Sequence, residues 1–212
     1  MEHIVSLVDL KSIRESNLGV IVDSMHGAAS GYIRSLIGDR CVLELRSECN
    51  PAFPGMARPE PIADNLLQLS RLILENQASI GIAFDGDGVR VGIVDENGQF
   101  VTTVTTFTLL AYYMLSVCAK RGPLVKSITS SSMIHKLGQI YDVPVYETPV
   151  GFKHICPIML REDALIGGEE SGGYAFRGHI PERDGIFSGL MMLEYMAKSC
   201  LLYTSPSPRD RG

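Results

Sequence analysis

The sequence predicts an α/β fold made of two consecutive α/β/α domains with mostly parallel, mixed sheets. Short apolar or β-branched runs, as at 19–23 and 79–84, end in or run directly into an acidic residue, which is typical of a buried parallel strand that meets a polar loop. Apolar residues at helical spacing separate these runs, as at 62–73. The alternation occurs twice without a long linker, which favours two closely joined α/β units.

The first unit alternates strands and helices in a regular order. Pro61 precedes a helical pattern, where proline suits the first turn, and four prolines and a glycine make 50–61 an extended, solvent-facing loop. The predicted elements are a strand at 19–23, a small-residue turn at 25–29 that opens a helix through 32 and 37, a strand at 41–46, the loop at 50–61, a helix at 62–73, a strand at 79–84 and a hairpin at 91–103.

The second unit begins with a long apolar helix that Gly122 and Pro123 interrupt. Asp184 is a candidate N-cap of the last helix. The predicted elements are a helix at 105–119, a strand at 124–129, a helix at 133–141, a strand at 143–147, a helix at 152–160, a strand at 164–167, a glycine-rich loop and a helix at 185–199.

These patterns divide the chain into four segments: a junction helix at 1–18, the first unit at 19–100, the second at 101–200 and a tail at 201–212. The tail has no periodicity, and we expect it to be unstructured. Its similarity to translated adapter sequence favours an artefact over a native disordered tail.

Composition narrows the classes of partner. The 212 residues are 45% hydrophobic and 20% charged, as in a well-cored globular protein, and the net charge of −5 disfavours nucleic acid but not small phosphorylated ligands. The five cysteines lack the spacing of a zinc or redox motif. The N-terminus has no signal-peptide core, and the longest apolar stretch, 107–119, is too short to span a bilayer. We therefore expect a cytoplasmic protein without a membrane partner.

Two aspartates follow the predicted strand at 79–84. Asp85 and Asp87 share a tight, glycine-containing loop at the strand's carboxyl end, where open α/β sheets bind ligands. Two carboxylates there form a hard oxygen site suited to Mg²⁺. An isolated D-x-D also fits an acidic surface turn. An EF-hand is excluded, because Arg90 stands where its loop needs glycine and Val89 occupies a ligand position.

The glycine-rich run at 167–173 contains a second group of polar side chains. Four glycines allow close approach of a ligand, and Glu169 and Ser171 can point to one side, where they could bind vicinal sugar hydroxyls. A hairpin with solvated acids is the alternative. Lys153 lies in the first turn of a helix, where it opposes the helix dipole, so it is a candidate for binding phosphate or, alternatively, a surface lysine. His179 and Arg183 stay ambiguous.

Taken together, these motifs resemble the α-D-phosphohexomutases, the family of phosphoglucomutase and phosphomannomutase. The similar segments cover nearly all of 19–199: VDSMHGA at 22–28, NPAFPG at 50–55, the loop at Asp85, VGFK at 150–153, GEESGG at 168–173, and 176–186, which is similar to the phosphoglucomutase branch.

The resemblance implies a four-domain enzyme in which 19–100 and 101–200 are the second and third domains and 1–18 leads from a missing first domain. Such enzymes move a phosphoryl group between the 1- and 6-hydroxyls of a hexose, as in glucose 1-phosphate and glucose 6-phosphate, through a phosphoserine and Mg²⁺. It also assigns roles: Asp85 and Asp87 ligate Mg²⁺, Arg90 lies near the phosphoserine, Lys153 is close to the reacting phosphate, and Glu169 and Ser171 hold sugar hydroxyls.

Two departures from the family pattern affect the expected activity. The third aspartate of the metal loop is replaced by Val89, which has no oxygen, so we expect weakened Mg²⁺ affinity. The chain also lacks the phosphoserine segment and the terminal phosphate clamp, and Met1 is similar to an internal position of the family. We therefore expect no mutase turnover from this polypeptide alone.

Two other interpretations stay open. The run from Ile80 to Val89 also resembles the first motif of haloacid-dehalogenase-type phosphatases, with Asp85 as nucleophile, but no later acidic pair after a strand completes that site. The other is non-catalytic: a sugar-phosphate-binding module or a gene remnant.

Overall fold

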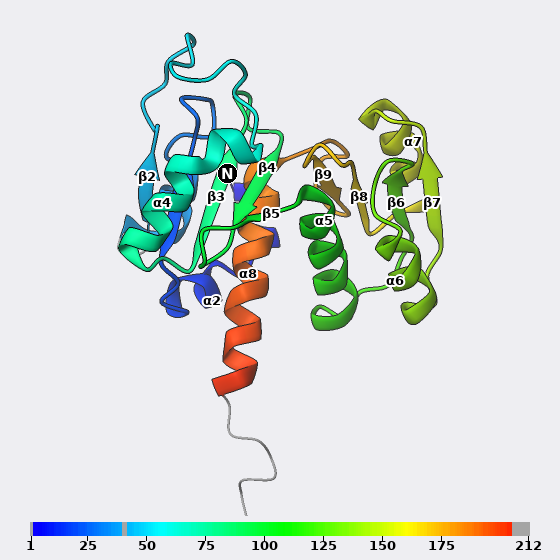
Figure 1. The fold of residues 1–212 in the computed structure, drawn as a ribbon. Coiled ribbons are helices and arrows are strands. Elements are labelled where there is room, and N and C mark those ends of the chain that lie inside the picture. The colour runs from blue at the N-terminus through cyan, green and yellow to red at the C-terminus, as the bar shows by residue number, and fades with distance from the viewer. Residues whose placement is uncertain (1, 40–41, 205–212) are drawn as a thin grey trace, which may run out of the picture.

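Two sheets lie side by side, with helix α8 standing between them, in a computed structural model that describes residues 2–39 and 42–204 (Figure 1). The strands are β1 Val20–Asp23, β2 Val42–Leu45, β3 Ile80–Phe84, β4 Val91–Val94, β5 Phe100–Val101, β6 Leu124–Ser127, β7 Val145–Thr148, β8 Ile166–Gly168 and β9 Tyr174–Phe176. The helices are α1 Glu2–Leu7, α2 Leu10–Glu15, α3 Tyr32–Ile37, η2 Ala63–Leu66, α4 Leu67–Asn76, α5 Thr103–Tyr112, the π-helical η3 Tyr113–Val117, α6 Met133–Tyr141, α7 Phe152–Glu162 and α8 Gly185–Thr204.

The first sheet has the strand order β2-β1-β3-β4-β5. β2, β1 and β3 are parallel, and β4 and β5 continue the sheet as an antiparallel hairpin. Side chains alternate along β3: Ile82 and Phe84 join the core that faces α8, whereas Gly81 faces α4. A Cβ at Gly81 would lie 2.6 Å from Ile73 Cδ1, so glycine allows α4 to pack closely.

The second sheet has the order β7-β6-β8-β9, with β9 antiparallel to its neighbour. α7 covers one face, where Ile155 and Met159 pack with Val125. Leu124 and Ile166 belong to the other core, which also contains residues of α5 and α6. Both sheets confirm the predicted fold class. The sequence did not predict β9, because three residues after a glycine-rich loop are too few to show a period of two.

Helix α8 follows the second sheet in sequence but packs against the first. Gly189 makes this possible, because an added Cβ would lie only 3.2 Å from Ile82 Cγ2. A single buried cluster contains Phe84, Tyr174 and Leu190, one from each sheet and one from α8. The two sheets therefore share one core, and the chain passes from the first sheet to the second between the end of β5 at Val101 and the start of α5 at Thr103.

Two short helices, α1 and α2, occupy the segment expected as one junction helix. Asp9 separates them and caps α2 by accepting a hydrogen bond from Ser12 N. The backbone N–H of Asp9 donates to Glu194 Oε2 on α8 at 3.2 Å, and Tyr113 Oη donates to Glu194 Oε1 at 2.6 Å. The buried Glu194 thus joins the N-terminal segment, η3 and α8.

The C-terminal part of the chain bears on two further expectations. α8 extends to Thr204, so it includes the first four residues of the expected unstructured tail, and 205–212 lie outside the described residues. Within the described part of the chain, no helix has the length and apolar character needed to cross a bilayer.

Candidate functional site

Residues 85–90, here called the acidic loop, turn sharply between β3 and β4. Gly88, at φ +76°, donates its N–H to Asp85 O at 3.1 Å and closes the turn. The Asp85 carboxylate is buried and accepts from Arg90 N at 2.9 Å and from Arg90 Nε at 2.5 Å. Arg90 Nη2 also reaches Glu60 Oε1 at 3.4 Å.

Burial and ion pairing act in opposite directions on this pair. Burial raises the pKa of Asp85, and the nearby charge of Asp87 adds to the rise, against hydrogen bonds from Arg90 that lower it. Burial alone would lower the pKa of Arg90, but the hydrogen bond and charge of Asp85 outweigh it and raise that pKa. Arg90 therefore stays charged and offsets the Asp85 carboxylate.

A Mg²⁺ ion at the acidic loop would find one free carboxylate and would keep most of its water. Asp87 is exposed and has no hydrogen-bond or ion-pair partner in the described residues, so its carboxylate is available. Asp85 shares its oxygens with Arg90, and Val89 offers no oxygen. The described residues contain no group of three His, Cys, Asp or Glu side chains placed to hold a metal. One or two carboxylates are a common protein contribution when phosphate oxygens supply the rest of the shell.

The glycine loop, residues 167–173, is the turn of the β8–β9 hairpin. Glu169 N donates to Gly173 O at 3.1 Å, and Gly172 N donates to Glu169 O at 3.3 Å. Glu169 is only 4% exposed, unlike the solvated acid of the alternative interpretation. Its carboxylate accepts from Gly151 N at 2.9 Å and from Ser171 Oγ at 3.4 Å.

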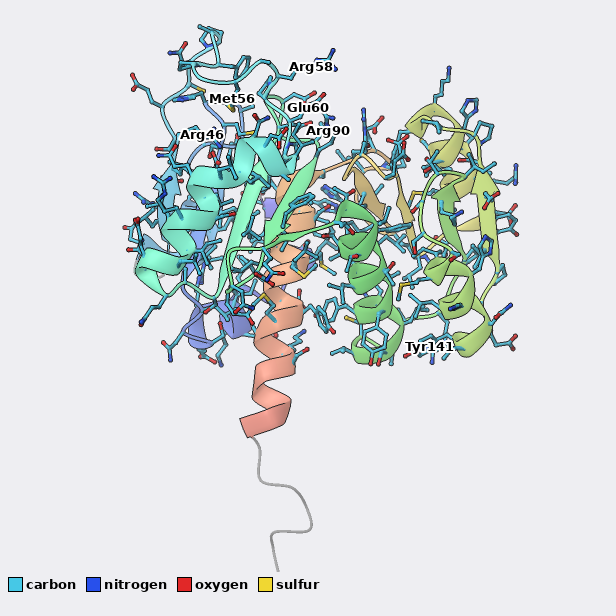
Figure 2. The ribbon with its side chains drawn as sticks, viewed as in Figure 1. Arg46, Met56, Arg58, Glu60, Arg90 and Tyr141 are labelled. Carbon is cyan, nitrogen blue, oxygen red and sulfur yellow. The ribbon has the colours of Figure 1, made fainter. Side chains whose placement is uncertain are left out.

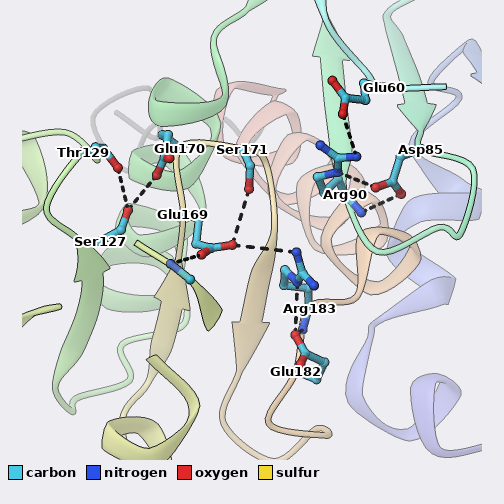
Figure 3. A network of polar contacts seen from close by, with 11 residues as sticks. Glu60, Asp85, Arg90, Ser127, Thr129, Glu169, Glu170, Ser171, Glu182 and Arg183 are labelled. Atoms are coloured by element: carbon cyan, nitrogen blue, oxygen red, sulfur yellow. Dashed lines mark hydrogen bonds and ion pairs between the residues drawn. The ribbon is translucent and has the colours of Figure 1, made fainter. Parts of the chain in front are cut away.

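Glu170 points away from Glu169, toward the end of β6 (Figure 3). It accepts a hydrogen bond from Ser127 Oγ at 2.8 Å, and Thr103 Oγ1 donates to its backbone carbonyl. Burial would raise the pKa of Glu170, but hydrogen bonds from Thr129 and Ser127 outweigh burial and lower it. These contacts hold the glycine loop so that Glu169 and Ser171 share the opposite side.

Lys153 lies at the start of α7, next to this loop in the fold. Because Gly151 N donates to Glu169, the turn that carries Lys153 is attached to the glycine loop. Lys153 itself is exposed and makes no ion pair within residues 2–39 and 42–204. Its position is compatible with an anion ligand.

Arg183 is a site residue that the sequence left ambiguous. Its Nη1 lies 3.9 Å from Glu169 Oε2, and its guanidinium stands 5.7 Å from the centre of the Phe152 ring. A Cβ at Gly173 would lie 2.3 Å from Arg183 Cδ, so that glycine makes room for the arginine. This contact joins Gly173 to a long side chain ten residues later in the sequence. No periodicity reveals a pair of residues at that separation.

His179 and Asp184 have structural partners. His179 Nε2 lies 2.8 Å from Asp184 Oδ2, and the imidazole stacks on the rings of His3 and Phe187. Asp184 Oδ1 accepts from Phe187 N at 2.8 Å, which caps α8 as the sequence predicted.

The acidic loop and the glycine loop come together in the fold, and Figure 3 shows side chains of both loops in one view. Val91 N, directly after the acidic loop, donates to Gly172 O at 3.0 Å, and Gly185 N at the start of α8 donates to Gly88 O at 3.0 Å. Added Cβ atoms at Gly172 and Gly185 would lie 2.8 Å from Val91 O and 2.7 Å from Arg90 O. Small residues thus bring the two sheets' polar loops together.

Comparison with known proteins matches both halves of the chain. Residues 1–98 match the domain described as phosphoglucomutase/phosphomannomutase, alpha/beta/alpha domain II, and residues 104–205 match domain III. A phosphoglucomutase/phosphomannomutase of Thermococcus kodakarensis is 31% identical over 94% of the chain, and a phosphoglucosamine/phosphogalactosamine mutase of Sulfurisphaera tokodaii is 29% identical over 92%. The chain spans only 44% and 43% of these relatives, less than half of their length.

Solved structures show the same arrangement. A Thermus thermophilus protein assigned to the phosphomannomutases is 35% identical, with a TM-score of 0.89 over 94% of this chain and 46% of its own. The N-acetylphosphoglucosamine mutase of Aspergillus fumigatus, crystallised with GlcNAc-6P and magnesium, has a TM-score of 0.64 at 16% identity, covering 90% of this chain and 50% of its own. The second likeness shows a shared fold alone.

Proposed function

Because the chain belongs to the phosphoglucomutase/phosphomannomutase family of isomerases, we propose that it is the central part of a phosphohexomutase. In this proposal the complete enzyme interconverts hexose 1-phosphate and hexose 6-phosphate, with glucose phosphates as the representative substrates. This chain contributes the loop for Mg²⁺ and the loop for the sugar. Residues 19–100 and 101–200 are the corresponding two domains.

One observation carries the proposal: the Val91 N to Gly172 O hydrogen bond joins the acidic loop to the glycine loop. Phosphoryl transfer needs the charge-stabilising groups and the acceptor sugar within one site, because positioning and electrostatics supply most of the catalysis. The contact supports a ligand that reaches both loops.

The proposed roles are those that the resemblance to the family implies, and charge and burial support them. Asp85 and Asp87 would hold Mg²⁺, which when bound would neutralise negative charge on a transferring phosphoryl group. Arg90, whose side chain is held by Asp85, would lie near the phosphoserine of the complete enzyme. Glu169 and Ser171 accept and donate hydrogen bonds to sugar hydroxyls, and the exposed Lys153 attracts the sugar's phosphate.

The purified chain should bind glucose 6-phosphate but should not convert glucose 1-phosphate. Calorimetry with Mg²⁺ present measures the first property, and a coupled assay for glucose 6-phosphate measures the second. Robust turnover would overturn the expected inactivity of this polypeptide. Binding without turnover is the expected result for a central part that holds the sugar without completing the reaction alone, and the absence of binding would contradict the assigned sugar loop.

Substituting Val89→Asp should tighten Mg²⁺ binding by roughly ten-fold, because a third carboxylate joins the loop and one tenfold step corresponds to about 1.4 kcal/mol. Calorimetric titration with MgCl₂ gives the comparison. Val89→Asn, which adds an uncharged oxygen, serves as the matched control and should increase the Mg²⁺ affinity less than Val89→Asp does. Equal affinity of wild type and Val89→Asp would refute the idea that Val89 weakens the site.

The haloacid-dehalogenase interpretation is not retained. The loop lies within residues 1–98, which match phosphoglucomutase/phosphomannomutase domain II.

A further inference from the structure

An open cleft of about 480 Å³ lies between the acidic loop and the proline loop, residues 50–61. Phe53, Arg58, Pro59 and Glu60 line one wall, and Gly86, Asp87 and Arg90 line the other. Figure 2 shows Arg58, Glu60 and Arg90 gathered at this end of the first sheet. Gly86 N donates to Pro59 O at 3.1 Å and holds the walls together at the base.

Some of the charged side chains that line the cleft have partners of opposite charge, and others do not. Arg90 contacts both Asp85 and Glu60, so its positive charge is already offset. Arg58 is exposed, and its guanidinium has no hydrogen-bond or ion-pair partner within the described part of the chain. Asp87 is likewise unpaired, and the two do not pair with each other. A ligand that satisfies both must carry both signs of charge, as a phosphoryl group with its divalent cation does.

The backbone of Arg58 is fixed although its side chain is free. Asn65 Nδ2 donates to Arg58 O at 2.9 Å and to Glu60 O at 2.8 Å, which fixes the carbonyl groups of the two residues that flank Pro59. Because the backbone that carries the guanidinium is already ordered, less conformational entropy is lost when Arg58 binds a ligand. The five N–H donors of that group match the oxygens of a phosphoryl group.

We infer that Arg58 is a phosphoryl-binding residue of this cleft, whose ligand is a phosphate monoester held together with a divalent cation. The inference deepens the proposed function and rests on it, because the cation would be the one at Asp85 and Asp87. Two kinds of molecule present such a phosphate monoester: a sugar phosphate and a phosphorylated serine side chain. Without the cation, Asp87 and Glu60 repel the dianion, so binding should require Mg²⁺.

The test compares the full chain with the variants Arg58→Gln and Arg71→Gln by calorimetry, with and without MgCl₂, using glucose 6-phosphate and O-phosphoserine as separate probes. Arg71 is an exposed arginine of α4 that does not line the cleft, so its loss removes the same charge elsewhere. Arg58→Gln should weaken Mg²⁺-dependent binding of at least one probe by about ten-fold, the scale of a charge-assisted hydrogen bond. The probe that is affected identifies the source of the phosphoryl group.

Three outcomes would overturn the assignment. Equal losses in Arg58→Gln and Arg71→Gln would indicate a general charge effect. If Arg58→Gln binds both probes normally while Glu169→Gln loses glucose 6-phosphate, the proposed function stands and the role of Arg58 fails. If the wild-type chain binds neither probe, both fail. Arg58→Lys adds a check on geometry, because it keeps the charge but loses the planar fork and should recover only part of the affinity.

Discussion

Replacing Asp23 with alanine should destabilise the fold by about 3–5 kcal/mol, the usual cost of removing one partner of a buried ion pair. Asp23 ends β1 with a fully buried side chain. Its carboxylate pairs with Arg46, whose Nε lies 2.9 Å from Oδ1 and whose Nη2 contacts Oδ2. Alanine would leave the guanidinium, only 14% exposed, without its counter-charge.

The substitution should also loosen the acidic loop. Asp23 Oδ1 accepts from Met25 N at 3.0 Å, and the turn that follows supports Gly86, whose carbonyl accepts from Ala28 N at 3.0 Å. A Cβ at Gly27 would lie 2.5 Å from Gly86 O, so the two turns are in direct contact. Loss of Asp23 therefore removes support beneath the acidic loop. We expect Mg²⁺ affinity to fall together with the free energy of unfolding.

Urea unfolding followed by circular dichroism measures the free energy of unfolding. Asp23→Asn is the conservative variant, since it keeps the shape and one acceptor oxygen, and it should lose less than alanine. Asp64→Ala, at an exposed position of η2, is the matched control and should change stability by no more than about 0.5 kcal/mol. A loss for Asp23→Ala as small as that of the control would show that the Arg46 pair contributes little.

Asp23 also shows what the sequence could and could not predict about the strand ends. The pattern placed Asp23 and Asp85 each at the end of a strand, and the structure confirms both strands and shows that they are parallel neighbours. The sequence does not reveal that Asp23 is neutralised by Arg46, because a partner 23 residues away has no periodic signal. Nor does it show that Arg90, five residues later in the chain, pairs with Asp85. Of Asp23, Asp85 and Asp87, Asp87 alone has a carboxylate without a partner in the part of the chain that the structure describes.

The fold was predictable wherever a segment was long enough to show its period. Strands such as β1 and β3 and the helix α4 stand close to their predicted positions, because burial of one face sets the spacing of apolar residues. The packing of α8 onto the first sheet was not predictable, since it depends on glycine contacts such as Gly189 against Ile82. The same holds for the meeting of the two loops, which depends on Gly172 and Val91.

The long apolar helix predicted at 105–119 was only partly correct. α5 begins at Thr103, where Thr102 Oγ1 accepts from Thr105 N as an N-cap, and a π-helical turn, η3, replaces the last part. Tyr113, the first residue of that turn, donates to the buried Glu194. A tertiary hydrogen bond of this kind is invisible to hydrophobic periodicity, which is why the change in helix type was missed.

Substituting Glu169→Gln should weaken glucose 6-phosphate binding by roughly 10- to 100-fold, because hydrogen bonds to charged groups contribute about 1.5–3 kcal/mol each. Glu169 is buried, so its carboxylate is poorly screened by water. Glutamine keeps one oxygen for Gly151 N but turns the other acceptor into a donor. Calorimetry in the presence of Mg²⁺ gives the affinity.

The control for this variant is Glu182→Gln. Glu182 also contacts Arg183, because Arg183 Nε donates to Glu182 Oε1 at 3.1 Å, but the Glu182 side chain is 54% exposed. If the negative charge beside Arg183 were all that mattered, the two variants would lose similar affinity. A sugar-binding role for Glu169 predicts a large loss in Glu169→Gln alone, with little change in the free energy of unfolding, since the bond from Gly151 N survives. If Glu169→Gln instead lowered the free energy of unfolding by as much as it weakened the free energy of binding, Glu169 would be assigned to holding the loop. Binding would then fall only because the loop unfolds.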